Sequence, residues 1–214
     1  MSTIAPLILK DAETGYVCRQ IPVLPENRDI IGRIKSFVKE AFEKAEYAGY
    51  SVEYDAQFDT HSDYFYVCDA YGKILATSRV TDKTGENPIP FEKALREGGE
   101  SYRVEEEGHI GDINSFVFSS FKALPILYAA VARFAELQGI QKGFCLLDET
   151  QERIRKIYLG GGFKYSNKYS DKVYFPDFGK IVKGILQPTL WSIMEIDRET
   201  IAGYSKTAGA HLKG

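Results

Sequence analysis

The segment from His109 to Phe163 constrains the fold more than any other part of the chain. Its first stretch, GHIGDINSFVFSS, is apolar and β-prone, whereas KALPILYAAVARFAELQG has a proline at a helix start and a glycine at its end. KGFCLLDE is a short apolar run, and TQERIRKIYLGGGFKY is an amphipathic helix pattern stopped by three glycines. The order strand, helix, strand, helix with short breaks predicts a right-handed crossover on a parallel strand pair.

The remaining segments predict further strands and helices around this unit. Residues 25–47 have apolar side chains at helical spacing, with Asn27 or Asp29 as a cap and Gly49 beyond the end. A hairpin is expected around Tyr71 and Gly72. Extended segments are expected at 51–58, 64–70, 73–81, 102–107, 168–175 and 190–196, and a short helix at 91–96.

These elements predict an α/β (α+β) fold in which a mixed, twisted sheet is flanked by helices. We expect a single domain over residues 1–202 and a flexible, small-residue tail over 203–214. A chain of 214 residues is long enough to bury a substantial core.

Composition narrows the class of partner and the compartment. The net charge of -3 argues against a general nucleic-acid binder. Cys18, Cys68 and Cys145 are odd in number and set among apolar residues, which is typical of buried thiols in a reducing compartment. No metal site is expected, because the histidines are scattered and no cysteines are paired. The N-terminal apolar run is too short for a signal peptide and no run approaches a membrane span, so we expect a cytoplasmic protein without a transmembrane segment.

The ending IRKIYLGGGFKY resembles the GNAT acyltransferase pattern, in which a tyrosine lies one turn before a Gly-Phe pair. Here these residues are Tyr158 and Phe163. The resemblance implies that two neighbouring strands part beside Asn114 to Phe118 and that the pantetheine arm of a thioester lies in the gap. Phe116, Val117, Phe118 and Phe163 would then contact the thioester.

The loop before the long helix differs from that of acetyl-CoA-dependent GNAT enzymes. Those enzymes place a glycine-rich turn there, whose amides hold the CoA pyrophosphate at a helix N-terminus. This chain reads SSFKALPIL, which has no glycine and has a proline that cannot donate. The difference indicates an acyl carrier protein as donor rather than a nucleotide-bearing thioester. No tightly bound cofactor is expected, since the acyl-phosphopantetheine thioester is a substrate.

The N-terminal half resembles acyl-homoserine-lactone synthases and the related long-chain N-acyl amino acid synthases. The matching residues are Arg33, Phe37, Glu53, Asp55, Phe58, Asp59, Tyr66 and Arg79, and DINSF occupies the place of Glu-Leu-Ser-Arg-Phe. The resemblance implies that Arg33, Phe37, Asp55, Arg79 and Ser115 bind the acceptor. Asp112 and Ser115 replace the family's glutamate and arginine, and the first-helix tryptophan is missing. These changes favour the N-acyl amino acid synthases over S-adenosylmethionine-using relatives.

The chemistry implied is aminolysis of a thioester. A carboxylate must take a proton from the acceptor amine, and the candidates are Asp112, Glu53, Asp55 and Glu107. Backbone amides of residues 116–118 can polarise the thioester carbonyl. Tyr158 is the candidate for protonating the leaving thiolate.

Each candidate also has a structural interpretation. Asp112 can satisfy a turn after Gly111, and Tyr158 can be a core aromatic. Glu53 and Asp55 can form a solvated strand edge with Arg79 as ion-pair partner. Glu107 belongs to an acidic run that is typical of an exposed surface.

A basic docking surface is expected for an acidic carrier protein. Its candidates are Lys122, Arg153, Arg155, Lys156, Lys164 and Lys168, with a solvated helix face as the alternative. The leading hypothesis is transfer of a fatty acyl group from a carrier-protein thioester to the amine of an amino acid or similar metabolite. The alternatives are an acetyl-CoA-dependent N-acetyltransferase, an autoinducer synthase and a lipid-sensing GNAT-like module without catalysis.

Overall fold

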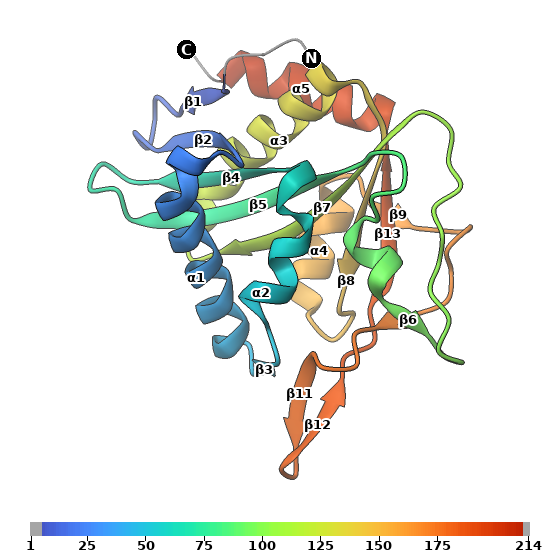
Figure 1. The fold of residues 1–214 in the computed structure, drawn as a ribbon. Helices are drawn as coiled ribbons and strands as arrows, with labels where there is room; N and C mark the ends of the chain where they lie inside the picture. Colours follow the sequence, from blue (N-terminus) through green and yellow to red (C-terminus); the bar gives the residue numbers. More distant parts are fainter. Residues whose placement is uncertain (1–5, 212–214) are drawn as a thin grey trace.

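An eight-stranded mixed sheet forms the centre of the protein in the computed structural model, which describes residues 6–211, with side chains to residue 206. Its strands follow the order β1-β2-β4-β5-β7-β8-β13-β9, and only β7 and β8 run parallel. Their bounds are Ile8–Lys10, Val17–Pro22, Ser62–Cys68, Ile74–Lys83, His109–Phe118, Ile140–Leu147, Ser192–Asp197 and Lys164–Tyr165. The predicted mixed sheet flanked by helices is confirmed (Figure 1).

Helices cover both faces of the sheet. Helices α3 (Leu124–Gln138) and α5 (Arg198–His211) lie on one face, α1 (Arg28–Lys44) and α2 (Val52–Asp55) lie on the other, and α4 (Glu152–Gly160) follows β8 (Figure 1). The predicted unit from β7 through α3 and β8 to α4 is confirmed. Pro125 lies at the start of α3, and Gly139 ends the helix in the left-handed region at φ 71°.

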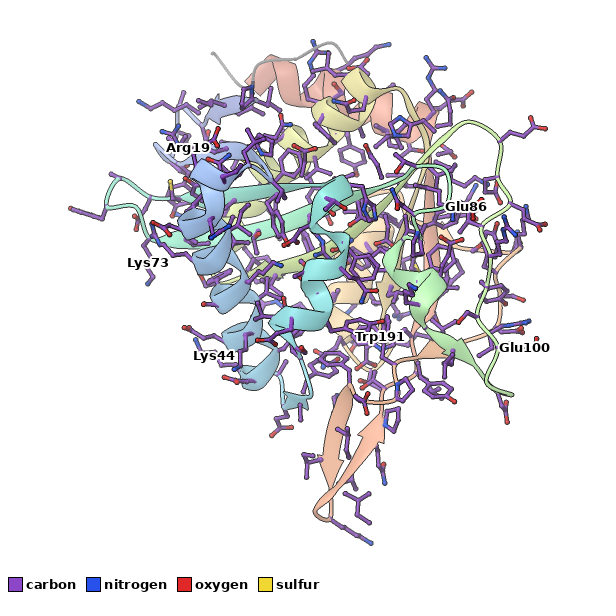
Figure 2. The ribbon with its side chains drawn as sticks, in the orientation of Figure 1. Arg19, Lys44, Lys73, Glu86, Glu100 and Trp191 are labelled. Carbon is purple, nitrogen blue, oxygen red and sulfur yellow. The ribbon has the colours of Figure 1, made fainter. Side chains whose placement is uncertain are left out.

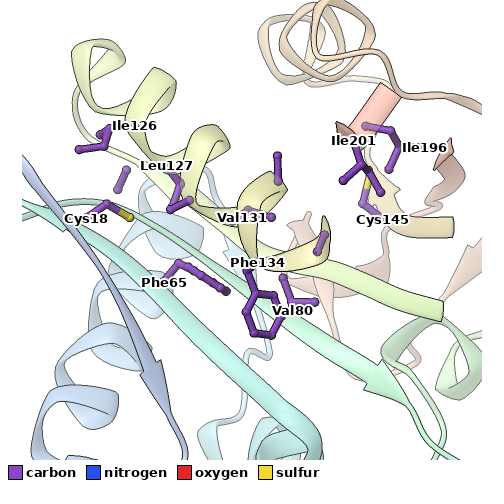
Figure 3. Close-up of a cluster of buried hydrophobic side chains, with 14 of the residues drawn as sticks. Cys18, Phe65, Val80, Ile126, Leu127, Val131, Phe134, Cys145, Ile196 and Ile201 are labelled. Carbon is purple, nitrogen blue, oxygen red and sulfur yellow. The ribbon is translucent and has the colours of Figure 1, made fainter. Parts of the chain in front are cut away.

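The main core lies between the sheet and α3. Leu127, Val131 and Phe134 of α3 pack against Phe65 and Cys18 of the sheet, and the cluster extends to β8, β13 and α5 (Figure 3). A smaller cluster lies under α1, where Ile31 and Ile34 contact Tyr64. Because successive side chains of a strand point to opposite faces, Phe65 and Tyr64 serve the two different cores.

Two small antiparallel sheets extend the structure. β11 (Gly179–Val182) and β12 (Ile185–Pro188) form a hairpin that projects from the molecule and pairs with β3 (Tyr47–Ala48) (Figure 1). β10 (Val173–Tyr174) pairs with β6 (Leu95–Arg96). No helix in the described part of the chain combines the length and the apolarity needed to cross a membrane.

Several predicted elements differ from the structure. Residues 51–58 are helical rather than extended, because the Ser51 hydroxyl accepts a hydrogen bond from the amide of Tyr54 and caps α2, which continues into the 3-10 helix η2 (Ala56–His61). The first helix ends at Lys44, since Tyr47 belongs to β3. Residues 102–107 form no strand. Instead, the Val104 amide donates to the carboxylate of Glu92, which fixes this segment without strand pairing.

Further differences concern residues 91–96, residues 168–175 and the two ends of the chain. The strand expected at 168–175 is reduced to β10, and the helix expected at 91–96 is the 3-10 turn η3 (Pro90–Lys93) followed by β6. The expected boundary at residue 202 lies inside α5, so residues 203–211 continue a helix, and residues 212–214 lie outside the described residues. The strands β1, β2, β11 and β12 were not predicted.

Candidate active site

The parallel strands β7 and β8 part halfway along their length. Their pairing begins at His109 with Ile140 and ends at Asp112 with Phe144. Beyond that point β7 remains paired with β5, and β8 remains paired with β13. The expected splaying of the central strands is therefore confirmed, and the gap begins directly after Asp112.

A bulge in β7 accompanies this separation. Between the pairs Thr77–Val117 and Arg79–Asn114, one residue of β5 faces two residues of β7, which are Ser115 and Phe116. Ser115 has a φ of 50°, a left-handed conformation that few residues other than glycine adopt. An extra residue of this kind bends the strand and increases its twist. The bulge thus turns the end of β7 away from the regular course that β8 follows.

A cleft of about 760 Å³ opens at the gap, which is within the usual range for small-molecule sites. It is bounded by the parted strands, by α1 and α2, by the start of α4 and by the residues around β11. Eight of the predicted site residues line it: Asp55, Arg79, Asp112, Ser115, Phe116, Val117, Phe118 and Tyr158.

Four predicted site residues do not line the cleft. Glu53 is exposed at the start of α2, where it accepts a hydrogen bond from Ser51, so it is not placed to act on a substrate in the cleft. Arg33 is exposed and donates to the carbonyl of Gly72, and Phe37 packs in the small core under α1. Phe163 lines a separate apolar cavity of about 30 Å³ behind Phe116 and Tyr158.

Asp112 is the buried carboxylate at the point where the strands part, and only 1% of it is exposed. Its Oδ1 accepts a hydrogen bond of 3.0 Å from the Asn114 amide, whereas its Oδ2 has no hydrogen-bond partner among the residues that the structure describes. Burial raises the pKa of Asp112 to about 7, against the opposing effects of the Asn114 amide and the charge of Arg79. A carboxylate that titrates near neutral pH is suited to take a proton from an amine.

Tyr158 of α4 lies across the gap and lines the cleft from the other side. Its ring contacts Phe116 with a centroid distance of 5.5 Å and Phe163 with a distance of 5.3 Å. Burial raises the pKa of Tyr158 well above its ordinary value, and Cys145, Tyr128 and Asp112 add to this effect. The phenol therefore keeps its proton at neutral pH and can act as a donor.

Arg79 organises a buried network on the α1 side of β7. Its Nη1 donates to Asp55 at 2.9 Å and to the Tyr64 hydroxyl at 3.1 Å, and its Nε donates to Asn114 at 2.7 Å. Burial opposes the charge of Arg79, but Asp55 and Tyr64 outweigh it and raise the pKa of the guanidinium. Lys35 adds a second cation, whose Nζ lies 2.8 Å from Asp59 and 3.4 Å from Asp55.

An aromatic wall, which we did not predict, faces the gap. Tyr47, Phe178 and Trp191 stack in a series with centroid distances of 5.4 to 5.9 Å, and Phe42 meets Tyr47 and Phe178 at their edges. All four side chains line the cleft, and Trp191 lies near the base of the β11–β12 hairpin (Figure 2). The sequence contained only a weak signal, because these aromatics come from three distant segments.

The β5–β7 hydrogen bonds narrow the choice of oxyanion donors. The Ser119 amide donates to Leu75 of β5. Amides along a strand point alternately to its two sides, so the Val117 amide also faces β5 and the Phe118 amide faces the gap. Val117 is thus poorly placed to polarise a carbonyl in the gap, and Phe118 is well placed.

A cation–π contact joins α4 to the loop between β7 and α3. The Arg153 guanidinium of α4 lies 3.6 Å from the centroid of the Phe121 ring, in the loop between β7 and α3. Arg153 also lines the cleft. By contrast, Lys164 lies near Glu195 and Asp197, and Lys168 pairs with Glu106. Of these three predicted docking residues, only Arg153 lies at the cleft.

Comparisons with solved structures identify the fold as that of the GNAT proteins. FeeM, an N-acyl amino acid synthase from uncultured soil microbes, is 15% identical with a TM-score of 0.57 and matches over 96% of this chain and 99% of its own. TofI, solved with an inhibitor and MTA, is 16% identical with a TM-score of 0.58 and matches over 87% of this chain and 95% of its own. FdhC, a nucleotide-linked sugar GNAT, is 8% identical with a TM-score of 0.54 and matches over 97% of this chain and 99% of its own.

These likenesses show the fold and no more, because the identities are low. No protein-family model matches the sequence, and no curated protein matches it either. The expected resemblance to N-acyl amino acid synthases and their relatives is confirmed at the level of structure.

Proposed function

We propose that the protein is an N-acyltransferase that moves a fatty acyl group from a carrier-protein thioester to the amine of an amino acid or related metabolite. One observation carries the proposal: the gap between β7 and β8 opens into a cleft that has Asp112 on one wall and Tyr158 on the other. The structural likeness to FeeM supports the same class of reaction.

The reaction begins with the acceptor amine. Its ammonium form has a pKa of about 8 to 10 by analogy with model amines, so it is mostly protonated at neutral pH. Asp112 takes one proton, directly or through a water, and the freed lone pair attacks the thioester carbonyl. The Phe118 amide faces the gap and supports the negative charge that develops on the carbonyl oxygen.

The intermediate then collapses by breaking the carbon–sulfur bond. The thiolate leaves with the bonding electron pair and receives a proton from Tyr158. The amide product retains the acyl carbon–nitrogen bond, and its nitrogen loses its remaining extra proton to solvent. Tyr158 is reprotonated from solvent, and Asp112 returns its proton there as well.

The donor assignment depends on the loop between β7 and α3. The loop SSFKALPIL contains no glycine, and Pro125 removes one donor from the start of α3. A pantetheine arm needs only the gap, whereas a nucleotide diphosphate needs a cradle of free amides. The apolar and aromatic walls of the cleft favour a fatty acyl chain over an acetyl group.

The test is an assay for acyl amides. The purified protein is incubated with acyl-carrier thioesters of several chain lengths, or with acetyl-CoA, together with a mixture of amino acids and amines, and products are identified by mass. We expect N-acyl products from the carrier thioesters. Because the carboxylate form of Asp112 is the active one and its pKa is about 7, kcat/KM should rise as the pH increases through this value.

Asp112→Asn should abolish this pH dependence together with most of the turnover. Formation of acetyl amides alone would indicate an acetyl-CoA-dependent enzyme. Absence of any acyl amide, with thioester binding retained, would indicate a binding module instead.

A further inference from the structure

We propose that Asn114 is a positioning residue whose side-chain amide links Arg79 to Asp112. Because Asn114 holds Oδ1 of Asp112, Oδ2 is the oxygen that receives a proton from the acceptor. This inference rests on the proposed function, in which Asp112 accepts that proton. It concerns a residue that replaces serine in the family motif and was not among the predicted site residues.

The hydrogen bonds of Asn114 fix the orientation of its amide. Its Oδ1 accepts from Arg79 Nε at 2.7 Å and from the Ser115 hydroxyl at 3.2 Å. A guanidinium can only donate, so the oxygen of the amide must face Arg79. The Nδ2 group must therefore face the opposite way, where it donates to Asp112 Oδ1 at 3.0 Å and to Thr81 Oγ1 at 3.0 Å.

This arrangement distinguishes the two oxygens of Asp112. Oδ1 is held by Asn114, and Oδ2 is buried without a partner. Buried polar atoms rarely lack a hydrogen bond, and a catalytic role is one of the explanations for an exception that lies in a cleft. Tyr50 Oη and Trp191 Nε1 are also buried without a partner, and both residues line the same cleft.

The charged and titratable groups around Asp112 come from four elements. Arg79 on β5 favours the carboxylate, whereas Glu92 on η3 opposes it, although Lys83 pairs with Glu92 at 2.6 Å. Cys145 of β8 and Tyr158 of α4 also lie near enough to interact with Asp112, and both are neutral at pH 7 because burial raises the pKa of each. Asn114 and the backbone of Phe91 both stabilise the charged form of Asp112, and Asn114 does so through its hydrogen bond of 3.0 Å to Oδ1.

Removing the Asn114 amide should therefore make Asp112 harder to ionise. A lost hydrogen bond to the carboxylate raises its pKa, and we expect the acid limb of kcat/KM to move upward by about 0.5 to 1 pH unit in Asn114→Ala. We expect kcat at pH 7 to fall by at least about 10-fold, because fewer molecules carry the carboxylate and its free oxygen is less well oriented. KM for the acyl thioester should change little.

The experiment compares Asn114→Ala with Asn27→Ala. Asn27 also donates its amide to the protein, to the carbonyl of Pro22, but it lies outside the cleft, so its variant should keep the wild-type pH profile. If Asn114→Ala does not fold, Asn114→Ser replaces it, since a hydroxyl is too short to reach both partners. Thermal unfolding of each variant separates a loss of folding from a loss of positioning.

A second readout does not depend on activity. Titration of carboxyl-labelled aspartate by NMR reports the midpoint of Asp112 in the wild type and in the folded Asn114 variant. An upward shift supports the inference even if the wild type forms no acyl amide, in which case only the proposed function fails. An unchanged Asp112 midpoint overturns the inference, and so does an unchanged acid limb in an active variant.

Discussion

Buried Tyr158 and half-buried Tyr128 contact the same phenylalanine but differ in their access to the cleft. The rings of Tyr158 and Tyr128 lie 5.5 and 5.6 Å from that of Phe116. Burial raises the pKa of both phenols, so both keep their protons at neutral pH. Only Tyr158 lines the cleft, whereas Tyr128 lines the small apolar cavity behind it. The pair thus provides a matched test of proton donation.

Tyr158→Phe should lower kcat by about 100-fold for an alkyl thiol leaving group, because the thiolate then leaves without a proton donor. The loss should be much smaller for a thiophenol ester, whose thiolate needs no proton to depart. Tyr128→Phe is the control and should stay within about 2-fold of the wild type with both esters. Equal losses with both leaving groups would exclude Tyr158 as the acid. The measurement is kcat from steady-state kinetics of each variant with the two thioesters.

Some residues of the candidate site could be predicted from short sequence motifs, whereas the placement of others depends on contacts in the folded protein. Asp112, Tyr158 and Arg79 were predicted because they lie inside short motifs within regular elements, and all three line the cleft. Glu53 was placed wrongly, since the hydroxyl of Ser51 caps a helix there and turns the segment out of the sheet. The role of Asn114 could not be seen, because it depends on the direction of its amide, which only the three-dimensional contacts determine.

Gly49, directly after β3, lies very close to the segment that leads into the hairpin of β11 and β12. Gly49 has a φ of 88°, and a Cβ built there would lie 1.7 Å from the carbonyl oxygen of Asp177. This close approach places the next residue, Phe178, in the aromatic wall. Gly184 in the hairpin turn has a similar φ of 79° but has no atom near its missing side chain.

Gly49→Ala should therefore perturb the aromatic wall, and Gly184→Ala should not. Both variants pay the cost of a left-handed alanine, about 1 kcal/mol, but only Gly49→Ala must also displace Asp177. We expect Gly49→Ala to lower the melting temperature further than Gly184→Ala and to raise KM for the substrates several-fold. Melting curves and kinetics test this, and equal effects of the two variants would contradict it.

Elements with strong boundary signals could be predicted from the sequence. The unit from β7 to α4 has a proline and a glycine at the ends of α3 and short connections, and it was predicted correctly. The segment at 102–107 has the composition of a strand. In the structure, however, the amide of Val104 donates to the carboxylate of Glu92 rather than to a strand. The β11–β12 hairpin was missed because its turn, Lys183-Gly184, requires a positive φ at a lysine.

At the scale of the whole molecule, the charge near the cleft mouth differs from the net charge. The chain as a whole carries -3, whereas the start of α4 presents Arg153 and Arg155. An acidic carrier protein that delivers its thioester to the gap would meet these two arginines together with the exposed ring of Phe121.

The double variant Arg153→Glu with Arg155→Glu should weaken use of a carrier thioester by about 10-fold or more in kcat/KM. Turnover of a short acyl-pantetheine mimic should change by less than about 3-fold. Lys73→Glu is the control, since Lys73 lies at the far end of the β4–β5 hairpin, well away from Trp191 (Figure 2). Equal loss with both donors would remove the docking assignment. The assay is a comparison of the two donors at several ionic strengths.

The left-handed residue Ser115 shapes the strand that borders the gap. Two strands that pair along their whole length offer no room for a reactant. The additional residue in β7 shifts its register against β5 just beyond the point where its pairing with β8 ends. Deletion of Ser115 should realign Phe116 to Phe118 against β5 and change the shape of the space in which the proposed chemistry takes place.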